Sequence, residues 1–224
     1  MTATPRQQAR IAATHTIKRI ARRQLAEGGA AALSLREIAK EMGLVSSAIY
    51  RYVPSRHALL TGLIADAYDR LGAAAETADA TLEPEDLAGR WRALANALRD
   101  WARADPTDYT LVYGPPIPGY DAPPETYAPA QRWIEVFIDI LARSDGAEAE
   151  PVNPVFLHQL ARVRDERSPY APLGGVAQGL AAWSQLHGLV SLEIYGQTAF
   201  VLGDATGLFE HCVERQIVDL RLAH

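Results

Sequence analysis

Residues 34–56 read SLREIAKEMGLVSSAIYRYVPSR, and their pattern predicts two short helices joined by a tight turn. Ser34 and Glu37 have the spacing of a capping box, in which each side chain bonds the other residue's backbone amide. Apolar residues then recur at helical spacing: Leu35, Ile38, Ala39 and Met42. Gly43 can adopt the backbone conformation that a sharp turn between helices requires. The stretch is therefore typical of a helix-turn-helix, whose second helix usually enters the major groove of DNA.

Charge is segregated around this stretch. Residues 1–60 hold ten lysines and arginines against three acids, a net charge of +7, whereas the remaining residues hold twelve against 24, a net charge of −12. The isoelectric point near 5.7 would argue against nucleic acid for the whole chain. Because binding depends on the field at one face, the basic part supports a DNA partner locally. Short helical hairpins with glycine at the corner also occur in proteins that do not bind DNA, so a protein-interaction module stays open as an alternative.

The segment GLVSSAIYRYVPSR, residues 43–56, with SLREIAKEM before it and HALL after it, resembles the N-terminal DNA-binding domain of the tetracycline-repressor (TetR) family. The resemblance covers about the first quarter of the chain. It implies that Tyr50 and Arg56 position phosphates, while Ser46, Ser47 and Arg51 read base edges. Val45 stands where the family commonly has a capping Ser or Thr, which leaves open where the recognition helix begins. We expect seven residues to contact DNA: Arg36, Ser46, Ser47, Tyr50, Arg51, Tyr52 and Arg56.

Helical periodicity continues to the end of the chain, and no run of alternating residues predicts a strand. Residues 72–83 are small and acidic and suggest a connection, and residues 114–124 are too rich in Pro and Gly for a regular helix. We therefore predict an all-α fold with a three-helix helix-turn-helix domain at 1–60 and a larger helical domain for effector binding and dimerisation at 61–224. Further helices are predicted at 6–28, 55–71, 84–104, 109–113, 133–141, 154–165, 172–195 and 200–220.

The last two predicted helices suggest a homodimer. The stretch 168–192 has no Asp, Glu, Lys or Arg, but its prolines and polar residues favour a buried helix over a membrane span. Gly203 and Gly207 are four residues apart and could allow helices to approach closely. We expect helices 172–195 and 200–220 of two subunits to form a four-helix dimer interface. The dimer would present two recognition helices to a palindromic operator. The alternative is that both helices belong to an ordinary core.

Trp183, His187 and Gly188 resemble the WHG-type C-terminal domain of some TetR-like regulators. The resemblance supports dimerisation and a sensing role. Aromatic residues gather between residues 101 and 183, where polar-tipped rings suit a cavity for a small, largely apolar effector. Each ring could also fill an ordinary core. The candidate effector-binding residues are Trp101, Tyr113, Tyr120, Trp133, Phe137, Trp183 and His187.

These observations predict a dimeric, ligand-responsive transcriptional regulator, with repression as the expected mode. No G-x-S-x-G elbow, H-E-x-x-H or paired cysteines are present, so we expect no enzyme activity, no metal and no cofactor. The single cysteine, Cys212, and the polar, basic N-terminus favour a cytoplasmic protein without a signal peptide. The remaining alternative is a constitutive DNA-binding or protein-interaction module without an effector.

Overall fold

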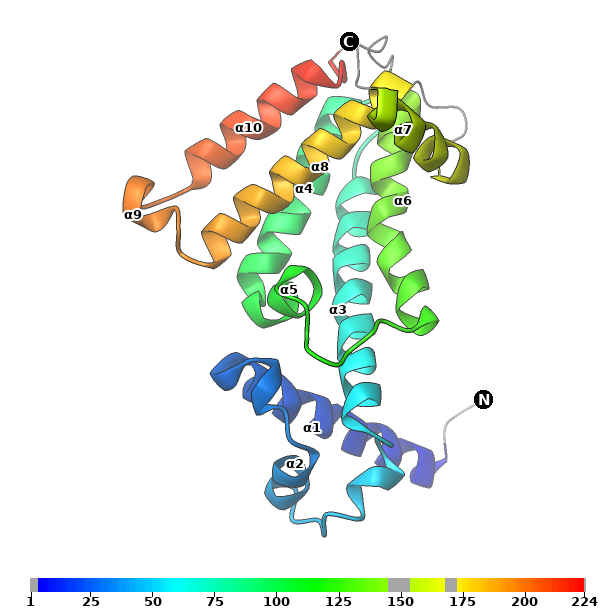
Figure 1. Cartoon of the computed structure of the whole chain (residues 1–224), viewed down its shortest axis with the longest axis vertical. Helices are drawn as coiled ribbons and strands as arrows, with labels where there is room; N and C mark the ends of the chain where they lie inside the picture. Colours follow the sequence, from blue (N-terminus) through cyan, green and yellow to red (C-terminus); the bar gives the residue numbers. More distant parts are fainter. Residues whose placement is uncertain (1–3, 145–153, 168–172, 224) are drawn as a thin grey trace. The chain divides into compact units, whose positions relative to one another are not determined.

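The computed structural model describes residues 4–144, 154–167 and 173–223. These residues form ten α-helices and three short 3-10 helices, and none of them lies in a strand (Figure 1). The predicted all-α fold is confirmed. The chain divides into two compact units: unit 1 contains residues 1–69 and 105–130, and unit 2 contains residues 70–104 and 131–224. This grouping places residues 105–130 with the N-terminal part of the chain, whereas the predicted domains divide the chain once, after residue 60. That division into a DNA-binding and an effector-binding domain stays a prediction.

Unit 1 is built around the N-terminal helices. Its elements are α1 (Pro5–Gly28), η1 (Ala30–Ala32), α2 (Leu35–Glu41), η2 (Ile49–Arg51), the first half of α3 (Arg56–Asp79), α5 (Pro106–Tyr113) and η3 (Pro124–Thr126). Their apolar faces meet in one core whose largest side chains are Ile17, Ile20, Ile38, Ile49, Leu59, Leu60 and Leu63. The helical periodicity of the sequence thus predicts this core correctly.

The predicted capping box at the start of α2 forms only in part. The Ser34 hydroxyl accepts a hydrogen bond from the Glu37 amide at 3.3 Å, as expected. The Ser34 amide donates instead to Oε1 of Gln24 on α1, at 3.0 Å. A side chain of a neighbouring helix therefore replaces the Glu37 carboxylate, and the cap also ties α2 to α1.

Helix α3 is longer than the sequence pattern predicts. Ser55 caps it, because its hydroxyl accepts from the Ala58 amide at 3.0 Å. The helix runs for 24 residues to Asp79, so the predicted connection at 72–83 is wrong for its first eight residues. The small residues of this stretch gave no helical pattern in the sequence. Gly72 is small for a packing reason, because a Cβ there would lie 2.6 Å from Cβ of Arg132. Glycine there permits a close helix contact and does not break the helix.

Unit 2 is a helical bundle. It contains α4 (Leu87–Ala104), most of α6 (Tyr127–Arg143), α7 (Pro154–Arg167), α8 (Leu173–Ile194), α9 (Ala199–Leu202) and α10 (Thr206–Asp219) (Figure 1). Apolar residues at helical spacing form the buried stripe of α4: Leu87, Trp91, Leu94, Leu98 and Trp101. Pro84 does not begin this helix; Asp86 caps it by accepting from the Gly89 amide at 2.8 Å. The predicted loop at 144–153 lies, after Ser144, outside the described residues.

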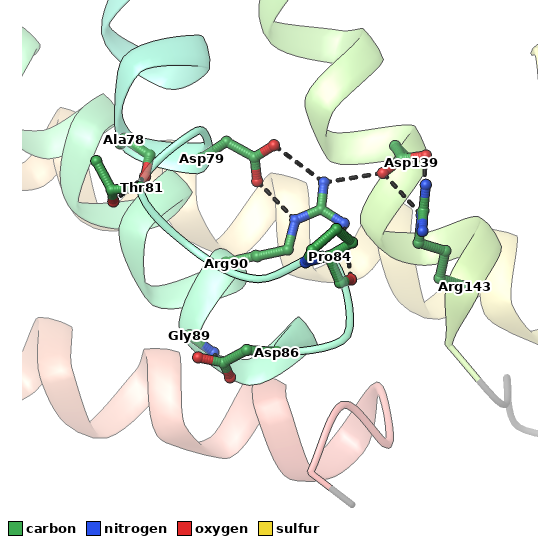
Figure 2. A network of polar contacts seen from close by, with 9 residues as sticks. All are labelled: Ala78, Asp79, Thr81, Pro84, Asp86, Gly89, Arg90, Asp139 and Arg143. Atoms are coloured by element: carbon green, nitrogen blue, oxygen red, sulfur yellow. Dashed lines mark hydrogen bonds and ion pairs between the residues drawn. The ribbon is translucent and has the colours of Figure 1, made fainter.

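A buried arginine holds one end of this bundle together (Figure 2). The Arg90 guanidinium donates to both carboxylate oxygens of Asp79, at 2.7 and 3.0 Å, and to Asp139 at 2.8 Å. It also donates to the Pro84 carbonyl at 3.3 Å. The hydrogen bond to Asp79 raises the pKa of Arg90. Burial alone would raise the pKa of Asp139, but hydrogen bonds from Arg90 and Arg143 outweigh burial and lower it.

Polar side chains also join α4, α8 and α10. The Trp91 indole donates to the Gln216 side chain at 3.1 Å, and Gln216 donates to the Ala182 carbonyl at 3.2 Å. Arg99 pairs with both carboxylate oxygens of Glu193 at 2.7 and 2.9 Å and donates to the Thr206 hydroxyl at 2.9 Å. These buried donors all have partners, which fixes the three helices relative to one another.

The predicted helix at 200–220 is divided in two. Gly203 has φ +69° and ends α9, and the Asp204 carboxylate then accepts from the Thr206 amide at 3.0 Å at the start of α10. The prediction of one continuous helix through Gly203 is therefore wrong, because this glycine supplies a positive φ at a break. A Cβ at Gly207 would meet no atom within 4 Å, so no described helix of this chain packs against it, and close approach by a second subunit stays a prediction.

Candidate DNA-binding surface and ligand cavity

The turn after α2 has the geometry that glycine makes possible. Gly43 has φ +67°, and its amide donates to the Lys40 carbonyl at 3.1 Å. The Leu44 amide donates to the Ala39 carbonyl at 2.9 Å, which completes a Schellman motif. Leu44 also packs against the core of unit 1. The predicted corner is thus confirmed in both its backbone and its apolar contact.

The segment after this corner is wound more tightly than the predicted recognition helix. The Ala48 amide donates to the Val45 carbonyl at 2.8 Å, and only Ile49–Arg51 forms a 3-10 helix. No side-chain hydrogen bond caps η2. Val45 has no side-chain oxygen with which to accept a backbone amide, so successive i to i+3 turns take the place of a capped α-helix. We call residues 45–53 the reading turn.

Five of the seven predicted DNA-contacting residues point outward. Arg36, Ser46, Ser47, Tyr50 and Arg51 are all exposed, and Tyr50 retains 55% of its accessible surface. A shallow groove of about 540 Å³ lies beside them, with Arg36, Lys40, Val45 and Ser46 in its wall. Lys40 was missed by sequence reasoning, although its spacing of four residues from Arg36 on one helix face could have identified it.

The other two predicted residues face the protein. Tyr52 is half-buried and packs against the core of unit 1. The Arg56 guanidinium donates to the Ala30 carbonyl, and its Nε donates to the Leu33 carbonyl at 3.3 Å. Arg56 thus satisfies carbonyls around η1, and these contacts give it a structural role of its own.

Part of the basic charge of α1 is also used internally. Lys18 pairs with Asp66 at 2.7 Å, and Arg22 pairs with Asp66 at 3.1 Å and with the buried Asp108 at 3.3 Å. Arg23 pairs with Glu41. The outer face of α1 keeps exposed cations at Arg6, Arg10 and Arg19. The positive charge available to a phosphate backbone is consequently smaller than +7.

Four of the predicted effector-binding residues form an aromatic cluster in unit 2. Trp133 stacks on Phe137 with ring centroids 5.5 Å apart, and His187 lies 5.7 Å from Trp133 and 4.7 Å from Trp183. Burial lowers the pKa of His187 to about 4, so the imidazole is neutral near pH 7. The rings pack directly on one another. Trp101, the fifth predicted residue from this unit, is buried on α4.

The other two predicted effector-binding residues, Tyr113 and Tyr120, belong to unit 1. Tyr113 lies 5.4 Å from Tyr109 and 6.2 Å from Tyr68, measured between ring centroids. Burial raises the pKa of both Tyr68 and Tyr113, so both phenols stay protonated. Tyr120 lies 4.7 Å from the His57 ring, and its hydroxyl is 3.2 Å from the Thr61 hydroxyl.

A cavity of about 290 Å³ opens beside these tyrosines in unit 1; we call it the Tyr68 cavity. None of its lining residues carries a charge, and Tyr120 is the one predicted effector-binding residue among them. Sequence reasoning missed Tyr68, although Ile64 and Tyr68 are four residues apart on α3. The lining residues are Ile64, Tyr68, Leu111, Val112, Gly114, Pro115, Pro116, Ile117, Tyr120, Ala122, Thr126, Tyr127 and Ala130.

A second apolar groove of about 530 Å³ is also lined by residues 115–117. It is bounded by residues 25–31 of α1 and η1 and by Pro106, Thr107 and Thr110 of α5. Both openings share Leu111 and residues 115–117. Within the described part of the chain, no three His, Cys, Asp or Glu residues are grouped to hold a metal ion. In the same part, no helix has the length and apolar content of a membrane span.

Comparison with known protein families agrees with this geometry. Residues 17–63 match the family model described as bacterial regulatory proteins, tetR family, and residues 91–216 match the tetracyclin repressor-like C-terminal domain. The second match covers more than half of the chain and includes Trp183, His187 and Gly188. The chain belongs to the TetR family. The helix-turn-helix is therefore the DNA-binding domain of a TetR-family transcriptional regulator, and the prediction of a non-enzymatic protein is confirmed.

Relatives of this TetR-family regulator carry the same description. The HTH-type transcriptional regulator Rv1816 of Mycobacterium tuberculosis H37Rv is 38% identical over 195 residues, with 81% of this chain and 80% of that protein covered. Mb1846 of Mycobacterium bovis, also an HTH-type transcriptional regulator, matches equally well. The crystal structure of SCO4313 is 37% identical, with a TM-score of 0.81 over 96% of this chain and all of that one.

A more distant TetR-family structure shows that the fold itself is shared. PfmR from Thermus thermophilus is 17% identical, with a TM-score of 0.55 over 92% of this chain and 97% of that one. At this identity the similarity concerns the fold alone.

Proposed function

We propose that this TetR-family regulator is a dimeric repressor that leaves a palindromic operator when a small, uncharged, largely apolar molecule binds. The observation that carries the proposal is the pairing of an outward-facing, basic reading turn with an uncharged cavity in the same unit. Both features involve α3, which begins directly after the reading turn and lines the cavity with Ile64 and Tyr68.

The proposed DNA contacts follow from exposure. Arg36, Lys40 and Tyr50 are placed to contact phosphates, and Ser46, Ser47 and Arg51 are placed to meet base edges. Much of the affinity should come from phosphate contacts and should therefore fall steeply with salt. Tyr52 and Arg56 would act indirectly. Tyr52 packs the reading turn against the core of unit 1, and Arg56 bonds the carbonyl that follows η1.

The proposed dimer surface is an exposed row of small and apolar residues in unit 2. On α8 it comprises Ala181, Ser184, Gly188 and Leu192, which recur every three or four residues. A Cβ at Gly188 would meet no atom within 4 Å, so a second helix could approach closely there. Other apolar side chains of unit 2 are also exposed: Tyr195, Phe200, Val201, Leu202 and, on α10, Val218. An exposed patch of this kind commonly marks a protein interface.

The proposed effector is uncharged because no side chain of the Tyr68 cavity could pair with a charge. The cavity volume of about 290 Å³ is at the lower end of the range for ligand sites, which favours a small molecule. Hydroxyl-bearing side chains among the lining residues, Tyr68, Tyr120 and Tyr127, could give the effector a few hydrogen bonds within a largely apolar wall.

Operator binding tests the DNA contacts. An operator is first selected from a random duplex library with the wild-type protein, and its dissociation constant is measured by fluorescence anisotropy. Arg51→Ala and Tyr50→Ala should each weaken binding at least tenfold, whereas Arg103→Ala, an exposed arginine of unit 2, should change it less than twofold. Wild-type affinity in both reading-turn variants would refute the proposed contacts.

Sedimentation velocity tests the dimer. Leu192→Glu should raise the dimer dissociation constant at least tenfold, because it would bury a carboxylate without a partner. Val155→Glu places the same charge on an exposed apolar residue of α7 and serves as the control. Equal dissociation constants for the two variants would mean that the exposed row of α8 is not the interface.

A further inference from the structure

The segment that follows α5 is a stiff strap. We define the strap as residues 114–122, GPPIPGYDA, three of which are prolines with fixed φ. Within it, the Tyr120 amide donates to the Ile117 carbonyl at 3.1 Å, and Gly119 has φ +71°. Pro118 and Gly119 thus occupy the two central positions of a type II turn, the residue types that this turn prefers. The turn fixes Tyr120 relative to Ile117.

One side of the strap rests on the DNA-binding part of unit 1. Ile117 and Tyr120 both pack against the core formed by α1, α2, η2 and the start of α3. The Tyr120 ring packs against the His57 ring with the planes tilted by 37°. The Tyr120 hydroxyl is 3.2 Å from the Thr61 hydroxyl, and the Asp121 carbonyl lies 3.2 Å from Nε2 of His57. His57 comes four residues after Val53, the last residue of the reading turn. The strap therefore contacts α3 where that helix leaves the DNA-binding surface.

The other side of the strap forms a wall of the Tyr68 cavity. Pro115, Pro116, Ile117 and Tyr120 all line it. A molecule in the cavity would touch Ile117 and Tyr120, the same two side chains that pack against the core of α1, α2, η2 and the start of α3. Because the turn between them is rigid, a displacement of either side chain is passed to the other.

We propose that the strap transmits occupancy of the Tyr68 cavity to the reading turn, and that Tyr120 is the positioning residue that makes the connection through His57 and Thr61. This inference rests on the proposed effector response and adds the contact that carries it. Tyr120 holds the first turns of α3 in the DNA-binding arrangement, and an occupant that moves Tyr120 releases them.

The test uses a covalent occupant, so that no natural effector has to be known. Ala130 lines the cavity and is half-buried, and Cys212 is a buried cysteine of unit 2. In full-length Cys212→Ala protein, Ala130→Cys is labelled with N-phenylmaleimide, an uncharged aromatic reagent. The measured quantity is the ratio of operator dissociation constants after and before labelling, which cancels any change in basal affinity.

We expect labelling to weaken operator binding at least tenfold when the strap is intact. Adding Tyr120→Leu should reduce the ratio to threefold or less. Thr61→Val removes the hydroxyl contact with Tyr120 and the hydrogen bond to the His57 carbonyl, and it should give an intermediate ratio. Tyr195→Phe, an exposed tyrosine of unit 2, should leave the tenfold ratio unchanged. If Tyr120→Leu does not fold at the assay temperature, Thr61→Val carries the test alone.

Equal ratios with and without the strap substitutions would overturn the role of Tyr120 and leave the effector response standing. A ratio near one in the parent protein would instead overturn the effector response at this cavity, and the strap proposal with it. The two failures are thus distinguishable in one set of measurements.

Discussion

Arginines serve opposite purposes in the two units of this protein. In unit 2, Arg90 and Arg99 are 4% and 5% exposed, and each pairs with both oxygens of a carboxylate. In unit 1, Arg36 and Arg51 are exposed, and within the described residues neither guanidinium has a hydrogen bond or an ion pair. A buried guanidinium must satisfy its donors inside the protein, whereas an exposed one keeps them for a phosphate or a base. The same residue type is therefore structural at Arg90 and Arg99, as it also is at Arg56 of unit 1, and available for binding at Arg36 and Arg51.

The largest effect should come from breaking a buried pair in unit 2. Arg90→Ala leaves Asp79 and Asp139 without their shared partner and should lower the free energy of unfolding by about 3–5 kcal/mol. The matched control is Arg92→Ala, whose ion pair with Glu214 is exposed and should be worth about 0–1 kcal/mol. Urea unfolding at fixed protein concentration measures both. A similar loss in the two variants would end the distinction between buried and exposed arginines.

The interior of unit 2 should also give the protein a sensitivity to acid. Burial lowers the pKa of His187 to about 4, below the ordinary value of 6.5. As the pH falls through 6.5, the unfolded chain gains a proton that the folded protein does not take up until about pH 4. Stability that is present above pH 6.5 is therefore lost between pH 6.5 and 4, by up to about 3 kcal/mol. His187→Gln should flatten this part of the unfolding profile, and an unchanged slope would contradict the assignment.

An exposed arginine of unit 1 should behave differently. Arg51→Ala should cost about tenfold in operator affinity, or about 1.4 kcal/mol, with little change in the free energy of unfolding. If Arg51 also contacts a phosphate, the slope of log K against log salt concentration should fall by about one. Anisotropy titrations at several salt concentrations give both numbers. A large loss of folding stability in Arg51→Ala would instead mean that Arg51 has a structural role, like Arg90.

The smallest of these effects concerns the corner of the helix-turn-helix. Gly43→Ala must keep φ near +67° and should lower the free energy of unfolding by about 1 kcal/mol. Gly62→Ala is the control in the same unit, because its Cβ would make an ordinary contact with Lys18 at 3.4 Å inside a helix. In thermal unfolding, Gly43→Ala should therefore have a lower midpoint than Gly62→Ala.

The sequence predicts local structure in unit 1 well because its signals are local. The Ser34 hydroxyl cap, Gly43 and the spacing of Leu35, Ile38 and Ala39 all act within one turn of helix, and the structure confirms each. The same signals fail where residues have two uses. Gly72 permits a helix contact and Gly203 ends a helix, but the sequence around each glycine does not show which of the two roles it has.

The candidate site was harder to predict because it depends on contacts between distant segments. Arg56 donates to a carbonyl 26 residues earlier in the chain, and Gln24 replaces the expected Glu37 at the Ser34 amide. Tyr68 was missed because the residues of α5 and of the strap that line the cavity with it are more than 40 positions away in the sequence. Spacing shows which face a residue occupies, but it does not show what lies opposite that face.

The inward-facing Arg56 has a consequence for genetics. A screen for loss of operator binding would recover changes at both Arg51 and Arg56, and the two phenotypes would look alike at one temperature. Only the Arg56 mutants should be rescued by growth at low temperature, because their defect is the loss of carbonyl contacts at Ala30 and Leu33. Temperature sensitivity would thus sort recognition alleles from folding alleles within a single stretch of six residues.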